Sequence, residues 1–115
     1  MFFWKKKPKV KAKEITDNNF NDVVLKSDKP VLVDFWGENC GPCRVLGPFV
    51  DNIANKYKEN ATVVKLCVNH NPKISRKYKI RSVPTILFFH KGELVEKYTG
   101  LIPQPNLEKI LESYM

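Results

Sequence analysis

The sequence predicts one α/β domain with a central mixed β-sheet and helices on both of its faces. Segments of strand length alternate with segments whose apolar residues recur at helical spacing. The order is strand, helix, strand, helix, strand, strand, helix, after one short helix. The first strand is apolar on both faces, which is typical of a strand inside a sheet that is covered on two sides. The length of 115 residues suits a single domain.

A short helix and a buried strand open the predicted domain. Thr16 is a candidate N-cap for this helix. The apolar face of the helix has residues at positions i, i+3 and i+4, namely Phe20, Val23 and Val24. Residues 30–36, PVLVDFW, then predict the buried strand.

A longer helix is predicted directly after Cys40-Gly41-Pro42-Cys43. Apolar side chains at helical spacing form its buried face: Val45, Leu46, Phe49, Val50, Ile53, Ala54 and Tyr57. Pro42 suits the first helical turn. Pro48 lies in the interior, where its ring and its missing N–H predict a kink.

The second half of the chain predicts three strands and two helices. Residues 62–68 alternate in polarity and predict a strand. A short helix is expected to begin at Pro72, and residues 85–90 and 93–99 predict a hairpin joined by a Lys-Gly turn. The closing helix carries a stripe formed by Leu107, Ile110, Leu111 and Tyr114.

The charge of the chain is concentrated at one end. The formal net charge is +8, from 20 Lys and Arg against 12 Asp and Glu. Residues 1–13 contain six lysines and no acidic residue, whereas residues 14–115 hold 14 basic and 12 acidic side chains. We therefore divide the chain into a basic N-terminal tail, 1–13, and a nearly balanced domain, 14–115. The apolar runs of the whole chain are far shorter than the roughly 20 residues that span a bilayer, so we expect a soluble or peripheral protein.

The Cys40 and Cys43 pair has the spacing of a redox site. The chain has three cysteines, too few for a disulfide scaffold. At the start of a helix, unpaired amides and the helix dipole favour a thiolate at Cys40, which makes it the nucleophile. Cys43, one turn further along, can then displace a mixed disulfide, so the pair predicts thiol–disulfide exchange.

Asp34 is a candidate for moving a proton in that reaction. A carboxylate in the middle of a buried strand is desolvated, which raises its pKa and allows it to accept the proton of Cys43. Lys65, expected on a neighbouring strand, is a candidate for modulating this acid. The alternative for Asp34 is a structurally paired carboxylate with no part in proton transfer.

These residues together resemble the thioredoxin family over residues 13–114. The matching features are the segment VDFWGENCGPCR, Pro48, the segment IRSVPT that contains Pro84, and the later glycines Gly92 and Gly100. The resemblance implies a thioredoxin fold and a protein-disulfide reductase that carries electrons in cell redox homeostasis. It also implies disulfide-containing protein substrates, no cofactor in the chain, and recharging by a separate thioredoxin reductase, either a flavoenzyme or a ferredoxin-linked one.

The resemblance further implies a substrate groove beside the cysteines. A cis Pro84 would lie against the pair, and Val83 would offer backbone groups to an extended substrate. The rim of the groove would consist of Trp36, Gly41, Pro42 and Gly100. Trp36 is also expected to donate its indole N–H to Asn69, where the family usually has an aspartate.

Three positions depart from the family pattern. Asn39 stands where the family usually has Trp, so a large apolar contact is lost beside the nucleophile, which bears on partner range and reductase docking. Arg44 replaces the usual Lys and keeps its charge. Pro103 stands where the family often has a Ser cap, so we expect the last helix to start near Pro105.

A zinc site is the first alternative, because the sequence contains both a C-x2-C and a C-x2-H pair. The four potential ligands are Cys40, Cys43, Cys67 and His70. Against this site, Cys67 ends an alternating strand, and the apolar segments supply a core without a metal. We expect no metal, and we expect Cys67 to be a small half-buried thiol rather than a regulatory or dimer-forming one.

A tethered binding module is the second alternative. Residues 1–13, MFFWKKKPKVKAK, combine an apolar start with a polybasic patch, two signals that together support weak contact with an anionic membrane surface. Nucleic acid is not expected as a partner, because the lysines are not interleaved with aromatic residues beyond Trp4. We expect a monomer in a reducing compartment, the cytoplasm or an equivalent organelle compartment.

Overall fold

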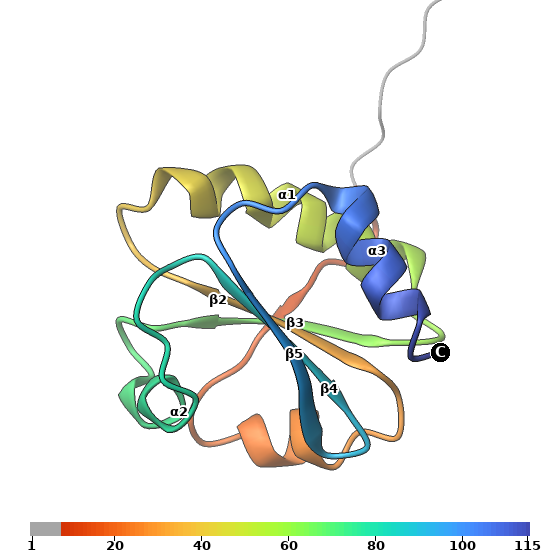
Figure 1. Cartoon of the computed structure of the whole chain (residues 1–115), viewed down its shortest axis with the longest axis horizontal. Coiled ribbons are helices and arrows are strands. Elements are labelled where there is room, and N and C mark those ends of the chain that lie inside the picture. The colour runs from red at the N-terminus through yellow and green to blue at the C-terminus, as the bar shows by residue number, and fades with distance from the viewer. Residues whose placement is uncertain (1–7) are drawn as a thin grey trace, which may run out of the picture.

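The computed structural model of the protein describes residues 8–115 (Figure 1). In this range the sheet has five strands in the order β1-β3-β2-β4-β5. The strands are β1 (Lys13–Glu14), β2 (Val31–Trp36), β3 (Thr62–Cys67), β4 (Thr85–His90) and β5 (Glu93–Thr99). Both β1 and β2 run parallel to β3, whereas β4 runs antiparallel to β2 and to β5. The sheet is therefore mixed, as the sequence predicts.

Helices cover both faces of this sheet (Figure 1). One face carries α1 (Gly41–Lys56) and α3 (Gln104–Glu112). The other face carries α2 (Pro72–Lys77) and a short helix of π type, η1 (Asn21–Leu25). Pro48 lies inside α1. The α/β fold with helices on both faces is therefore confirmed.

The sheet divides the apolar core into two layers. Leu32 and Phe88 pack with the residues of α1 and α3, whereas Val33 and Leu87 pack with those of α2 and η1. All four side chains are at most 1% exposed, and burial of each contributes about 1.5–3 kcal/mol. Because side chains alternate along a strand, Asp34 lies on the same face of β2 as Leu32, beneath α1.

Two predicted helix starts differ from the structure. Thr16 is not the cap of the first helix, because η1 has Phe20 at its N-cap position. The backbone N–H of Thr16 instead donates to Asn19 Oδ1 at 2.8 Å, and this local side-chain bond forms a turn ahead of the helix. The last helix begins at Gln104, one residue before the expected Pro105.

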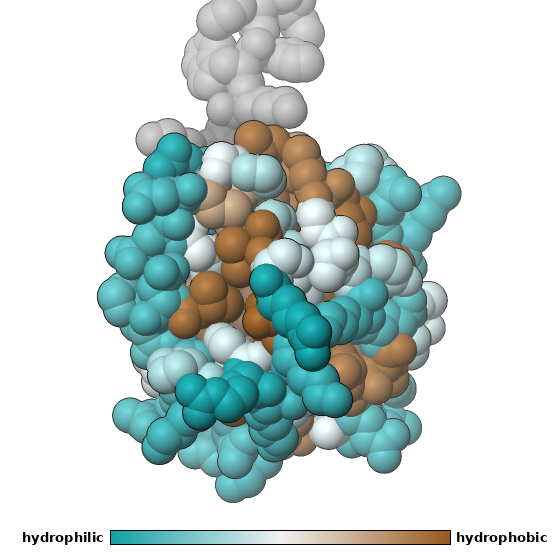
Figure 2. Space-filling view, turned by 60° about the vertical axis from the view of Figure 1, so that its left-hand side comes forward, coloured by the Kyte–Doolittle hydropathy of each residue, from teal (hydrophilic) through white to brown (hydrophobic). Residues whose placement is uncertain are grey.

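The surface near the N-terminal end of α1 is partly apolar. Figure 2 brings this side of the molecule forward and shows brown apolar surface between polar side chains. Val45 on α1 and Leu101 after β5 are 49% and 48% exposed, the largest values for Val and Leu side chains in the described part of the chain. Scattered exposure of this size is ordinary for a soluble surface, but its place beside the cysteine pair suits contact with another protein.

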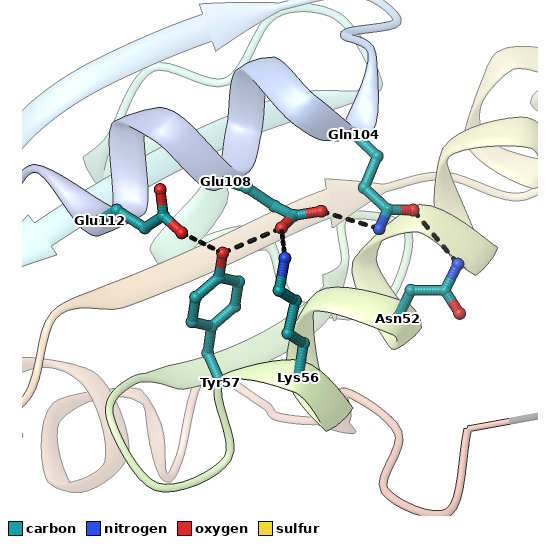
Figure 3. Close-up of polar contacts among 6 residues, drawn as sticks. All are labelled: Asn52, Lys56, Tyr57, Gln104, Glu108 and Glu112. Carbon is teal, nitrogen blue, oxygen red and sulfur yellow. Dashed lines mark hydrogen bonds and ion pairs between the residues drawn. The ribbon is translucent and has the colours of Figure 1, made fainter.

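A polar cluster joins the C-terminal end of α1 to α3 (Figure 3). Glu108 is at its centre and accepts from Lys56 Nζ at 2.6 Å and from Tyr57 Oη at 2.9 Å. Gln104 donates to the other oxygen of Glu108 at 2.9 Å and accepts from Asn52 at 3.1 Å. The cluster therefore fixes α3 against the end of α1 that is far from Cys40.

The β4–β5 turn requires glycine at its second position. Lys91 and Gly92 have φ angles of 52° and 81°, both in the left-handed region that suits a tight hairpin turn. A Cβ atom on Gly92 would also lie 3.0 Å from the carbonyl oxygen of Leu25.

Gly92→Ala is therefore expected to lower the free energy of unfolding by about 1–2 kcal/mol, measured by urea denaturation. Lys91→Asn is the matched control, because asparagine tolerates a left-handed backbone, and it is expected to be neutral. A Gly92→Ala protein with the wild-type midpoint would contradict this.

Candidate active site

Cys40 and Cys43 form a disulfide at the start of α1. Cys40 is the N-cap residue of the helix, and its Sγ accepts the backbone N–H of Cys43 at 3.2 Å. Cys43 is only 6% exposed, whereas Cys40 is half-buried. In the reduced protein the same N–H and the helix dipole favour a thiolate at Cys40. Cys40 is therefore the more accessible of the two cysteines.

The turn that leads into this helix explains Asn39. Its φ angle of 56° lies in the left-handed region, which asparagine adopts more readily than most residues. The resemblance to the family by itself implies only the loss of a large apolar contact at this position. The backbone conformation gives a second reason for asparagine, and Gly41 and Pro42 follow it as exposed residues of the turn and the first helical turn.

A cis-proline lies beside the cysteines. The peptide bond between Val83 and Pro84 is cis, as the family resemblance implies. The carbonyl oxygen of Val83 lies 3.7 Å from Cys40 Sγ, and the carbonyl oxygen of Pro84 accepts the N–H of Gly100 at 2.9 Å. Three of the predicted groove residues are therefore brought together next to Cys40.

A cavity of about 420 Å³ lies on the other side of the helix start. It is lined by Glu14, Asp34, Trp36, Gly37, Glu38, Asn39, Cys43, Arg44, Gly47 and Lys65. The cavity therefore brings the predicted acid, its predicted modulator and the second cysteine to one space. Trp36 belongs to this cavity as well as to the end of β2.

Asp34 is a buried carboxylate. It is 1% exposed, and within residues 8–115 its Oδ1 atom has no hydrogen-bond partner. Burial raises the pKa of Asp34 to about 7, against the lowering effect of Lys65 and with smaller raising effects of Glu14 and Asp51. The expected desolvation is confirmed, and a carboxyl group of this kind can exchange a proton near neutral pH.

Lys65 is held by a residue that the sequence did not single out. Among the described residues, Lys65 Nζ pairs with Asp51 Oδ1 at 3.1 Å and not with Asp34. The same oxygen of Asp51 accepts the backbone N–H of Ala12 at 3.1 Å. Asp51 follows Gly47 by one turn of α1, and a Cβ on Gly47 would lie 3.5 Å from Lys65 Nζ. The sequence signal that could have identified Asp51 is an acidic residue next to the apolar stripe of α1.

The expected partner of the Trp36 indole is wrong. Trp36 Nε1 donates to Glu14 Oε1 at 2.8 Å and not to Asn69. Asn69 Oδ1 instead accepts the backbone N–H of Glu38 at 2.8 Å and lies 3.8 Å from the thiol sulfur of Cys67. Glu14 reaches the indole because β1, a strand of two residues that the sequence did not predict, brings it to the edge of the sheet.

The residues of the zinc hypothesis are not gathered into a metal site. Cys67 is buried next to Asn69, and His70 Nε2 lies 3.6 Å from Glu38 Oε2. In the part of the chain from residue 8 onwards, no group of three or more His, Cys, Asp or Glu side chains is placed to hold an ion.

Of the helices described in residues 8–115, none has the length and apolar character that crossing a bilayer requires.

The fold and the site define a class of protein. A dithiol pair at the start of a helix, a cis-proline beside it and a buried carboxylate beneath it on a mixed sheet constitute a thiol–disulfide oxidoreductase. The thioredoxin family model matches residues 11–113. The chain belongs to the thioredoxin family.

Several thioredoxins are similar to this chain over about nine-tenths of its length. Thioredoxin 1 of Nostoc sp. is 43% identical over 104 residues, which is 90% of this chain and 97% of the relative. Thioredoxin of Porphyra purpurea is 44% identical over 102 residues, covering 89% and 95%. The chloroplastic M-type thioredoxin of Chlamydomonas reinhardtii is 41% identical over 107 residues, covering 93% and 76%. The protein is thus a protein-disulfide reductase.

Proposed function

We propose that Cys40 and Cys43 carry out this reduction in two steps. The Cys40 thiolate attacks one sulfur of a substrate disulfide, that S–S bond breaks, and the other substrate sulfur leaves as a thiolate. Cys43 then gives its proton to Asp34 and attacks Cys40 Sγ, which releases the second substrate thiolate and leaves the Cys40–Cys43 disulfide. Two electrons pass to the substrate. The cavity shared by Asp34 and Cys43 is the observation that supports this order of roles.

Lys65 is proposed to keep the proton on Asp34 exchangeable. Its register partner on β2 is Asp34, and its positive charge lowers the pKa of that carboxyl group while burial raises it. Asp51 holds the ammonium group in place from α1.

The proposed substrate groove surrounds Cys40. An extended substrate segment would pair with the backbone of Val83, whose carbonyl oxygen lies beside the nucleophile. The apolar rim is proposed to consist of Trp36, Gly41, Pro42, Pro84 and Gly100. The exposed side chains of Val45 and Leu101 extend this apolar surface.

The protein is proposed to act as an electron carrier between a thioredoxin reductase and disulfide-containing proteins, as a monomer in a reducing compartment. Cytoplasm and chloroplast both fit, because the relatives include cyanobacterial and chloroplastic thioredoxins.

We also propose that the chain divides into a basic tail, 1–13, and a domain, 14–115, and that the tail makes weak contact with an anionic membrane surface. Residues 1–7 lie outside the described range, and Val10 and Ala12 donate hydrogen bonds to α1.

Reduction of a model protein disulfide by dithiothreitol tests the proposed function. Wild-type protein is expected to accelerate the reaction at catalytic concentration, because each turnover restores the dithiol. Cys40→Ser is expected to give the rate of dithiothreitol alone. Equal rates with wild type and Cys40→Ser would show that the pair does not carry electrons to proteins.

A further inference from the structure

Glu14 holds the indole of Trp36 from a strand at the edge of the sheet. Its Oε1 accepts the indole N–H at 2.8 Å across 22 residues of sequence. Hydrogen bonds to an ionised acceptor are stronger than neutral ones, so this contact restricts the rotation of the Trp36 side chain. The ring it fixes is part of the wall of the cavity that contains Asp34 and Cys43.

The sheet register places Glu14 in the same row as the proposed proton acceptor. Glu14 is opposite Lys65 in the β1–β3 pair, and Asp34 is opposite Lys65 in the β2–β3 pair. Register partners on parallel strands project to the same face, so the three charged side chains lie side by side on the face of the sheet that α1 covers, with Glu14 exposed at its edge. Two acids therefore flank one lysine along this row.

Other charged groups reach this space from the neighbouring elements. Asp51 comes from α1 and binds Lys65, Arg44 comes from the first turns of α1, and Glu38 comes from the loop after β2. Of the acids that act on Asp34, Glu14 has the larger effect and Asp51 the smaller, and both raise the pKa of Asp34. Burial raises the pKa of Glu14 itself, while the Trp36 bond and Lys65 lower it.

We propose that Glu14 is a positioning residue for the second step of the reaction, in which it fixes Trp36 as a wall of the Asp34–Cys43 cavity and supplies a negative charge in the row of Asp34. This inference rests on the roles proposed above for Cys43 and Asp34. Glu14 forms and breaks no bond in the reaction, and the proton of Cys43 still goes to Asp34. The residue acts through the side chains beside it.

Two substitutions separate the hydrogen bond from the charge. Glu14→Gln keeps a carbonyl oxygen that can accept the indole N–H but removes the charge, whereas Glu14→Ala removes both. Glu59→Gln is the control, because it removes a charge of the same sign from an exposed residue outside the cavity. All variants carry Trp4→Phe, which leaves Trp36 as the single tryptophan of the chain.

The first readout is the indole N–H of Trp36 in proton–nitrogen NMR spectra. In Glu14→Ala the signal is expected to shift and its exchange with solvent to become faster, while Glu14→Gln keeps slow exchange. Glu59→Gln is expected to match wild type. An unchanged indole signal in Glu14→Ala would overturn the positioning role.

The second readout is the pH profile of the second step, followed as release of the substrate thiol from a mixed disulfide on Cys40. Removal of the Glu14 charge is expected to move the midpoint to lower pH in both Glu14 variants, since it lowers the pKa of Asp34. Glu14→Ala is in addition expected to be several-fold slower than Glu14→Gln. Midpoints equal to that of Glu59→Gln would overturn the proposal, whereas failure of wild type to release thiol would instead contradict the proposed function.

Discussion

Asp34→Asn is expected to raise the free energy of unfolding by up to about 4 kcal/mol at pH 8 and to give no gain near pH 4. The cause is burial, which raises the pKa of Asp34 from 3.8 to about 7. Between these two values the folded protein retains a proton that the unfolded chain has released, so wild-type stability falls as pH rises. Above the folded-state pKa of Asp34, the wild-type protein has lost this contribution to its free energy of unfolding completely, and the loss no longer changes with pH.

Urea unfolding of the oxidised protein at several pH values measures this difference. The gap between Asp34→Asn and wild type should widen from about pH 4 to pH 7 and then level off. Asp28→Asn, which alters an exposed acid, is the control and should give no such gap. A gap that does not vary with pH would mean that Asp34 is paired in the folded protein.

The same substitution is expected to slow the second step of the reaction. Without the Asp34 carboxylate, Cys43 loses the proton acceptor proposed for it, and general bases typically contribute at least about 100-fold. Stopped-flow release of the substrate thiol at pH 7.5 should therefore be about 100-fold slower in Asp34→Asn, with the first step unaffected. Equal release rates would leave Asp34 with a structural role only.

Cys43→Ser is expected to abolish turnover while leaving the first step intact. Serine cannot displace a disulfide, so the mixed disulfide on Cys40 should persist, and catalytic reduction should fall to the rate without protein. Cys67→Ser is the matched control, because this buried thiol lies outside the pair and should leave turnover unchanged. Turnover by Cys43→Ser close to that of wild type would contradict the resolving role.

Local patterns in the sequence were enough to predict the cysteine pair and the buried acid. Cys40 and Cys43 are three positions apart at a helix start, and Asp34 is flanked by apolar residues on its own strand. Such features depend on neighbours in the chain, so periodicity and spacing reveal them. Apart from β1, the order of strands and helices was predictable for the same reason.

The contacts that surround the acid depend on distant residues and were not predicted. Glu14 meets Trp36 only because β1 joins the edge of the sheet, and a strand of two residues leaves no periodic signal. Asp51 meets Lys65 from a helix on the sheet face. The expected Trp36–Asn69 bond was wrong because the backbone N–H of Glu38 takes the amide oxygen of Asn69.

The predictions for helix caps and turns were wrong for a different reason. Side chains of Thr, Asn and Asp can bond to several nearby backbone groups, and the sequence does not say which one they choose. Thr16 is in a turn closed by Asn19 rather than at the helix N-cap. The sequence indicates only that Asn39 removes the apolar contact of the family's usual Trp. Its left-handed φ of 56° shows that it also has a conformational role.

The identity of the attacking sulfur is the central claim, and trapping the mixed disulfide tests it most directly. Cys40→Ser and Cys43→Ser are each incubated with a disulfide-linked peptide, and the adducts are located by digestion and mass spectrometry. The expected result is a stable peptide adduct on Cys40 in Cys43→Ser and none on Cys43 in Cys40→Ser, because Cys43 is only 6% exposed. An adduct that forms on Cys43 as fast as on Cys40 would contradict the claim.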